Sequence, residues 1–232
     1  MKKIGFSEQL AGRRFAFLLA LLLTTMLLYS LVGNGTPLRI ALYVIFTLSM
    51  ISALDEMRAQ RVIFFLGLAS GIIGQTLSIY GEVSQSTAVT IVGHSARFFF
   101  LGIVIFAILR TILNTEKVEI DAIFGASCCY MLIGYAFSDI YRIMESLHPD
   151  TFSGISHADK SWVPRFGDMP RDAEIVYFSL ITLTTVGYGD IVPQSPPARF
   201  VAALEGIVGQ LFLAVIVARL VALEISARLK RD

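Results

Sequence analysis

Long apolar segments recur along the chain and define its pattern of hydrophobic and polar positions. Six of these segments are long enough for a transmembrane helix, which takes about 20 residues. They run from Phe15 to Val32, Leu38 to Leu54, Val62 to Tyr80, Ala88 to Leu113, Ile120 to Met144 and Phe200 to Leu223. A shorter segment, from Ala173 to Leu183, contains no helix breaker but is too short to span. The pattern predicts six transmembrane helices and one re-entrant helix that is followed by a loop.

The composition supports a membrane protein. Hydrophobic residues make up 55% of the 232 residues and charged residues 16%, whereas a soluble domain of this length needs a more polar surface. The net charge of +1 gives no indication of a nucleic-acid partner. Cys128 and Cys129 are adjacent within a predicted span, where packing of small side chains is expected rather than a disulfide. We therefore expect an all-α protein whose surroundings are the lipid bilayer.

Basic residues gather at alternate connections between the predicted spans. They lie in both terminal tails and in the second-to-third and fourth-to-fifth connections: Lys2, Lys3, Arg13, Arg14, Arg58, Arg61, Arg110, Lys117, Arg219, Arg228, Lys230 and Arg231. The first two connections on the other side carry Arg39 alone. By the positive-inside rule, the sequence predicts that both termini are cytoplasmic and that the loop around Tyr188 lies on the outer side.

A glycine-containing stretch follows the short segment directly and reads Thr184, Thr185, Val186, Gly187, Tyr188, Gly189, Asp190. Gly187 and Gly189 allow positive φ, so that successive carbonyl oxygens can turn to one side. Such a row, with the Thr185 hydroxyl at its inner end, can replace the water around a cation. Val186 and Tyr188 are expected to pack behind the row. A plain turn after a helix would look similar, but the short helix before it and the long one after it favour irregular backbone at membrane depth.

The stretch from Thr185 to Asp190 resembles the selectivity filter of tetrameric potassium channels, whose loop reads T-V-G-Y-G. The resemblance is strong over residues 173–210 and only architectural elsewhere. It implies a six-transmembrane channel of bacterial type, in a plasma membrane such as the bacterial inner membrane. Residues Thr185 to Gly189 would bind potassium, which passes without covalent chemistry, so neither an enzyme nor a cofactor nor a further metal site is expected. One filter per chain and no internal repeat imply a homotetramer.

The resemblance also assigns residues that support the filter. In the family a tryptophan thirteen residues before the filter aspartate bonds to it; Tyr177 occupies that position before Asp190, and its phenol can replace the indole. Thr184 and Glu205 are the other expected supports. Glu205 lies inside the last span, where a carboxylate is costly, so we expect a hydrogen bond to a hydroxyl such as that of Ser179 or Thr182; protonation or contact with water are the alternatives.

A gating hinge is the next feature that the resemblance implies. Gly209 lies nineteen residues after Asp190 and matches the family's hinge glycine, with Gly206 as a nearby alternative. Bending there would widen the inner mouth.

The chain divides into a basic tail at residues 1–14, a four-helix membrane domain at 15–113 and a pore domain at 114–232. The four-helix domain stands where the family has a voltage sensor, which needs a basic residue at every third position of its fourth span. Only Arg97 and Arg110 occur there, so we expect weak or absent voltage gating. His94 lies one turn before Arg97, and the pair is either a polar sensor in the membrane or part of the outer interface.

Three rival functions stay open from the sequence: a non-selective cation channel, a non-conducting membrane sensor or subunit, and a secondary transporter. A transporter should carry a second discontinuous segment in an inverted half, which the sequence does not show. Nine residues follow Leu223, and control by nucleotide or calcium is therefore expected to need an unknown regulatory subunit.

Overall fold

The computed structural model describes residues 14–31, 61–114, 120–155 and 171–229. These residues form six α-helices and two short strands. In chain order they are α2 (Arg14–Leu31), α4 (Arg61–Ser84), α5 (Thr87–Asn114), α6 (Ile120–Leu147), β1 (Phe152–Ser153), α7 (Arg171–Leu183), β2 (Val192–Pro193) and α8 (Pro196–Leu229). The predicted span from Leu38 to Leu54 lies outside the described residues. The structure confirms a helix at each of the five other predicted spans and at the short segment from Ala173 to Leu183.

Three of the described helices are long and apolar enough to cross a membrane: Thr87–Asn114, Ile120–Leu147 and Pro196–Leu223. Two shorter apolar helical segments, Phe15–Leu27 and Phe65–Gly81, lie in α2 and α4. The protein is an all-α membrane protein apart from its two-residue strands, and the count of six spans stays a prediction.

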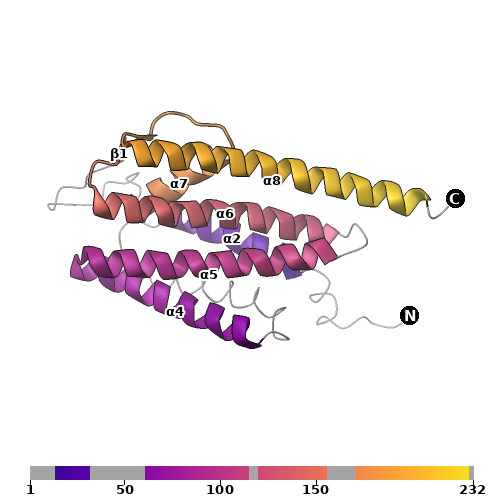
Figure 1. The fold of residues 1–232 in the computed structure, drawn as a ribbon, viewed down its shortest axis with the longest axis horizontal. Helices are drawn as coiled ribbons and strands as arrows, with labels where there is room; N and C mark the ends of the chain where they lie inside the picture. The colour runs from indigo at the N-terminus through magenta and orange to yellow at the C-terminus, as the bar shows by residue number, and fades with distance from the viewer. Residues whose placement is uncertain (1–13, 32–60, 115–119, 156–170, 230–232) are drawn as a thin grey trace.

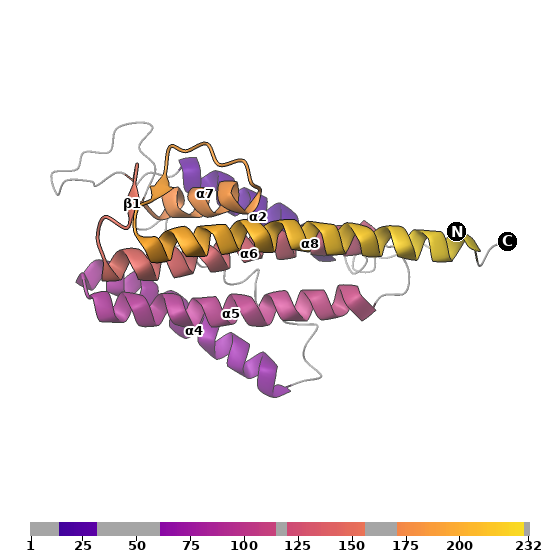
Figure 2. The ribbon, with the colours of Figure 1, turned by 45° about the horizontal axis from the view of Figure 1, so that its top comes forward.

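The long helices lie side by side in the order α4, α5, α6, α8 (Figure 1). Helix α2 packs on α6, and the short helix α7 contacts both α6 and α8. Figure 2, a view turned by 45°, shows α7 and the loop after it at the end of the bundle where α8 begins, and α8 running past the other helices toward the C-terminus. The α6–α8 pair therefore carries α7 and the loop at one end.

Close helix contacts depend on glycines where α4 meets α5. A Cβ atom at Gly74 would lie 2.6 Å from the backbone nitrogen of Arg97, and one at Gly93 would lie 2.5 Å from that of Ser78. Both distances are shorter than van der Waals contact, so only glycine allows this approach. The short connection between the two helices is held by a hydrogen bond of 3.2 Å from the Ser86 amide to the Gly81 carbonyl.

Two apolar clusters form the interior. The larger joins α2, α5 and α6 and includes Leu22, Leu101, Val104, Ile108 and Leu132. The smaller surrounds α7, where the rings of Tyr141, Phe152 and Phe178 meet edge to face with centroids 5.1–5.4 Å apart. Because these rings come from α6, β1 and α7, they hold α7 against α6.

Candidate functional site

The loop of residues 184–190 begins at the C-terminal end of α7 and is tied to that helix end by its own backbone. The amide groups of the four consecutive residues Thr184 to Gly187 donate to carbonyl oxygens in the last turns of α7, at distances of 2.9–3.2 Å. These bonds satisfy carbonyls that a helix end otherwise leaves without partners. The loop therefore folds back at the end of α7.

The backbone of this loop alternates between positive and negative φ. Thr185, Gly187 and Gly189 have φ of 59°, 53° and 79°, whereas Val186 and Tyr188 are not among the residues with positive φ. Positive φ at the two glycines was predicted and is confirmed. Thr185 was not predicted, because a β-branched residue rarely adopts this conformation. The alternation is the backbone geometry that lets successive carbonyl oxygens share one side.

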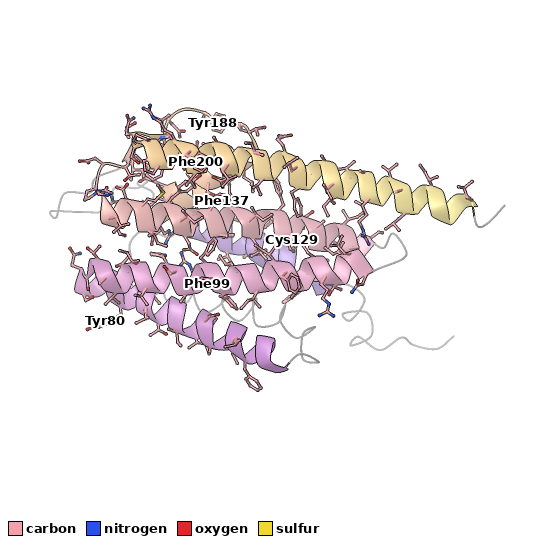
Figure 3. All side chains as sticks on the ribbon, in the orientation of Figure 1. Tyr80, Phe99, Cys129, Phe137, Tyr188 and Phe200 are labelled. Atoms are coloured by element: carbon pink, nitrogen blue, oxygen red, sulfur yellow. The ribbon has the colours of Figure 1, made fainter. Side chains whose placement is uncertain are left out.

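The carbonyl oxygens of Thr185 to Tyr188 accept no hydrogen bond from any residue in the described part of the chain. The side chains of the loop are exposed as well: 53% for Val186 and 72% for Tyr188. No helix in the described part of the chain covers these two side chains, so their packing behind the carbonyl row stays a prediction. Figure 3 shows Tyr188 on the side of the molecule opposite Tyr80 of α4.

Asp190 ends the loop and is held by Tyr177 of α7. The Tyr177 hydroxyl donates to the Asp190 carboxylate at 2.8 Å, which is the pairing expected from their separation of thirteen residues. This hydrogen bond lowers the pKa of the Asp190 carboxyl below its ordinary value. The same bond raises the pKa of the Tyr177 phenol. The carboxylate is thus kept ionised at the C-terminal end of the loop.

The backbone after Asp190 is fixed by a contact that the sequence did not reveal. Strand β2 pairs with β1 in antiparallel register, Phe152 opposite Pro193 and Ser153 opposite Val192. Gly154 follows β1 with φ of 88°, and a Cβ atom there would lie 1.9 Å from the Asp190 carbonyl oxygen. Only a glycine fits here, so Gly154 allows the chain after β1 to pack directly against the backbone of Asp190, a contact that we call the clamp at Gly154.

Glu205 of α8 lies fully buried behind α7. The Tyr141 hydroxyl of α6 donates to one carboxyl oxygen at 2.6 Å, and the Ser179 hydroxyl of α7 is hydrogen-bonded to the other. The bond to Ser179 is the one the sequence favoured, while Thr182 donates to its own helix, at the Phe178 carbonyl, instead. Tyr141 was missed because nothing in the periodicity of α6 shows which helix its side chain faces. Glu205 therefore joins α6, α7 and α8.

Gly209 of α8 lies at the closest approach of α8 to the end of α7. A Cβ atom at this position would lie 2.3 Å from the Leu183 carbonyl oxygen, and that oxygen also accepts a hydrogen bond of 2.9 Å from the Tyr130 hydroxyl. At Gly206 the nearest atom to an added Cβ is the Thr182 carbonyl oxygen, 3.9 Å away. Close packing thus requires glycine at Gly209 whether or not α8 bends there.

The side chain of Gln210 in α8 contacts the loop directly. The Gln210 amide nitrogen donates to the Thr185 hydroxyl at 3.1 Å. Sequence reasoning missed Gln210, although it is one of three polar side chains, with Glu205 and Arg219, between Phe200 and Leu223.

His94 and Arg97 of α5 are buried and bind Asp139 of α6. The His94 ring nitrogen lies 2.9 Å from an Asp139 oxygen, and the Arg97 guanidinium donates to both Asp139 oxygens, Nε at 2.9 and 3.0 Å. Sequence analysis did not identify this partner of Arg97, which comes from the fifth predicted span. Further along α6, Arg142 forms an ion pair of 3.0 Å with Asp172 at the start of α7. Charged contacts thus connect α5, α6 and α7.

Comparison with known proteins supports this site. Residues 172–224, which hold α7, the loop and most of α8, match the model of a family described as ion channel. The match indicates an ion channel. The chain is also similar to protein LctB of Bacillus caldotenax, with 29% identity over 133 residues that make up 53% of this chain and 94% of that protein. No solved structure matches the chain.

Proposed function

We propose that the protein is a potassium-selective channel in which four chains surround one pore. Each chain contributes the oxygens of Thr185, Val186, Gly187, Tyr188 and Gly189 as ligands for a dehydrated potassium ion, which crosses passively. Thr184, Asp190, Tyr177 and Glu205 support this filter. Potassium is cargo here, and the channel needs neither catalysis nor a cofactor.

The observation that carries the proposal is the alternating backbone of the loop. Positive φ at Thr185, Gly187 and Gly189 supports a row of oxygens on one side, and the oxygens of Thr185 to Tyr188 accept no bond from the described residues. Rings of backbone carbonyls that take the place of the hydration shell are the means by which potassium channels select their ion. The C-terminal end of α7, with its negative dipole end, faces the same loop and favours a cation there.

Assembly of several chains is supported by what one chain leaves uncovered. Irregular backbone at membrane depth is tolerated only where protein buries it or where it borders water. Within one chain the loop is exposed, and so are apolar side chains of α8 such as Phe200, Ile207, Leu211 and Val215. Copies of the same loop around a central axis would cover the side chains and leave the carbonyls facing a water-filled pore. Four copies follow the resemblance to tetrameric channels.

The remaining parts of the proposal follow the charge pattern. The protein lies in a plasma membrane, and both termini face the cytoplasm. Residues 114–232 form the pore domain and residues 15–113 form the peripheral domain. Voltage gating is weak or absent, because Arg97 is bound to Asp139 of the pore domain instead of standing in a row of mobile charges. The lipid bilayer is the medium in which the tetramer assembles.

Reversal potentials of the purified protein in planar bilayers test the proposal. With unequal potassium concentrations on the two sides and sodium making up the difference, the proposal predicts a reversal potential close to the potassium equilibrium potential. A reversal potential near zero would identify a non-selective cation channel, and the absence of current would identify a non-conducting subunit. Either result would overturn the proposal.

A further inference from the structure

The side chain of Gln210 is the part of α8 that reaches the inner end of the ion-binding loop. Its amide nitrogen lies 3.1 Å from the Thr185 hydroxyl, across 25 residues of sequence. The preceding residue, Gly209, packs so tightly on the end of α7 that an added Cβ atom would lie 2.3 Å from the Leu183 carbonyl oxygen. The contact is therefore built into the packing of α8 on α7.

Thr185 needs such a contact because its backbone conformation is unfavourable. A β-branched residue with φ of 59° is strained and persists only where its surroundings hold it. On the backbone side, the Thr185 amide donates to the Thr182 carbonyl at 2.9 Å. On the side-chain side, Gln210 donates to its hydroxyl. Backbone and side chain are thus held by two different helices, α7 and α8.

The chemistry of the contact bears on the cation. A hydroxyl oxygen has two lone pairs, and the amide donor uses one of them, which leaves the other in a defined direction. The amide oxygen of Gln210 is a further acceptor. A ligand oxygen held in place before the ion arrives binds it with less loss of entropy than a freely rotating one.

We propose that Gln210 is a positioning residue for the inner end of the ion pathway. It orients the Thr185 hydroxyl and thereby determines how tightly a dehydrated cation binds there. The inference rests on the proposed channel function and deepens it, since it names a side chain outside the loop that sets cation binding within it.

Block by barium from the side of the C-terminus measures this binding, because barium is a divalent cation of nearly the same radius as potassium. Gln210→Met preserves the length of the side chain and removes the amide. We expect the variant to conduct. The Kd for barium applied from the side of the C-terminus (inner barium) should rise about three- to tenfold, the factor that corresponds to one neutral hydrogen bond. Block from the outer side should stay within about twofold, which a general weakening of the pore would not produce.

Leu211→Met is the matched control, because Leu211 neighbours Gln210 and is exposed on α8. We expect it to leave barium block unchanged. If Gln210→Met does not assemble, Gln210→Leu carries the same expectation. A conducting Gln210 variant whose inner barium Kd changes by less than twofold, or falls, would overturn the positioning role while leaving the channel function intact. No current from the unmodified protein would instead overturn the channel function itself.

Discussion

Thr185 carries the least expected feature of the loop. Among the described residues, three that are not glycine have positive φ: Gln85, Asp150 and Thr185. Of these, Thr185 alone is β-branched. Conformations of this kind cost roughly 1–3 kcal/mol and gather at functional sites. The sequence predicted the two glycine positions because glycine adopts positive φ freely. It could not predict Thr185, whose conformation is imposed by contacts with α7 and α8.

Glu205 is a second residue whose role depends on its surroundings. The Ser179 hydroxyl has one proton, but it lies against both the Glu205 carboxyl group and the Gly134 carbonyl oxygen, the latter at 2.6 Å. One proton can serve two acceptors only in a bifurcated arrangement, which weakens each hydrogen bond. A protonated Glu205 resolves the conflict by donating to Ser179, which then donates to Gly134.

Replacing Glu205 therefore has different outcomes for two variants. Glu205→Ala leaves the Tyr141 and Ser179 hydroxyls buried without their partner, and we expect a loss of about 1–3 kcal/mol in the free energy of unfolding. Glu205→Gln keeps one donor group and one acceptor and should retain both stability and potassium preference. Thermal unfolding in detergent and reversal potentials check the two results. A stable Ala variant, or a Gln variant without potassium preference, would refute the supporting role.

Tyr177 and Asp190 predict a pH dependence at the outer mouth. The hydrogen bond from Tyr177 lowers the pKa of Asp190, so the charge of the carboxylate is present above that lowered pKa and is lost as the pH falls through it. In Tyr177→Phe the pKa should return toward its ordinary value. We expect the acid-induced fall in single-channel current to begin at a higher outer pH in the variant.

The matched control is Tyr80→Phe, since Tyr80 is an exposed tyrosine of α4 on the opposite side of the molecule (Figure 3). Its acid response should equal that of the unmodified protein. An identical response in Tyr177→Phe would show that Asp190 does not set the charge at the mouth.

At the scale of elements, the helices were predictable and their contacts were not. Apolar runs broken by polar connections locate α2, α4, α5, α6, α7 and α8 because hydropathy records where a chain can cross or enter a bilayer. Hydropathy does not record how each helix is rotated about its axis. For that reason the partners Asp139 of Arg97 and Tyr141 of Glu205 emerged only from the packed structure. The clamp at Gly154 was missed because the sequence does not show that the two short strands β1 and β2 pair.

Helix α6 connects the parts of the molecule through four neighbouring side chains. Asp139 binds α5, Tyr141 binds Glu205 of α8, and Arg142 binds Asp172 of α7, while Glu145 forms an ion pair with Arg171 of α7. These contacts lie within two turns of the helix. Helix α6 therefore joins α5 to the start of α7 through charged contacts.

Arg97 held in this way should not act as a gating charge. We expect a shallow conductance–voltage relation in symmetric potassium, and an equally shallow one for Arg97→Gln. That variant leaves the buried Asp139 with one partner fewer. We expect its free energy of unfolding to fall by several kcal/mol, the usual effect of removing one member of a buried ion pair. A steep relation that the substitution abolishes would show that Arg97 moves in the field.

Gly209 offers a test that separates packing from bending. Gly209→Ala places a methyl group 2.3 Å from the Leu183 carbonyl oxygen, whereas Gly206→Ala meets nothing closer than 3.9 Å. We expect the first variant to unfold at a lower temperature and to lose conduction, and the second to keep both properties.

The hinge role of Gly209 remains a prediction that opening kinetics can address. If Gly209→Ala is as stable as Gly206→Ala and changes only the open probability, bending rather than close packing explains the glycine. If Gly206→Ala alone alters opening, the hinge lies at Gly206.

At the scale of the whole molecule, burial is uneven among the described residues. The best-buried parts are the α2–α5–α6 interior and the aromatic cluster around α7, while the loop and much of α8 are exposed. An assembly that covers the loop explains this distribution, because polar backbone exposed to hydrocarbon is strongly unfavourable. The proposed tetramer places the parts that one chain leaves open around a single axis.

The central claim, that the backbone of this loop passes potassium-like ions, is tested most directly by thallium uptake into sealed vesicles. Gly187→Ala forces a Cβ atom into positive φ where the chain offers no atom within 4 Å, so it acts on backbone conformation and not by a clash within the chain. Gly102→Ala makes the same change in α5, also with no atom within 4 Å and without positive φ. We predict rapid uptake with the unmodified protein and with Gly102→Ala, and uptake reduced to the level of empty vesicles with Gly187→Ala. Uptake by the unmodified protein no faster than in empty vesicles, or undiminished uptake with Gly187→Ala, would contradict the account.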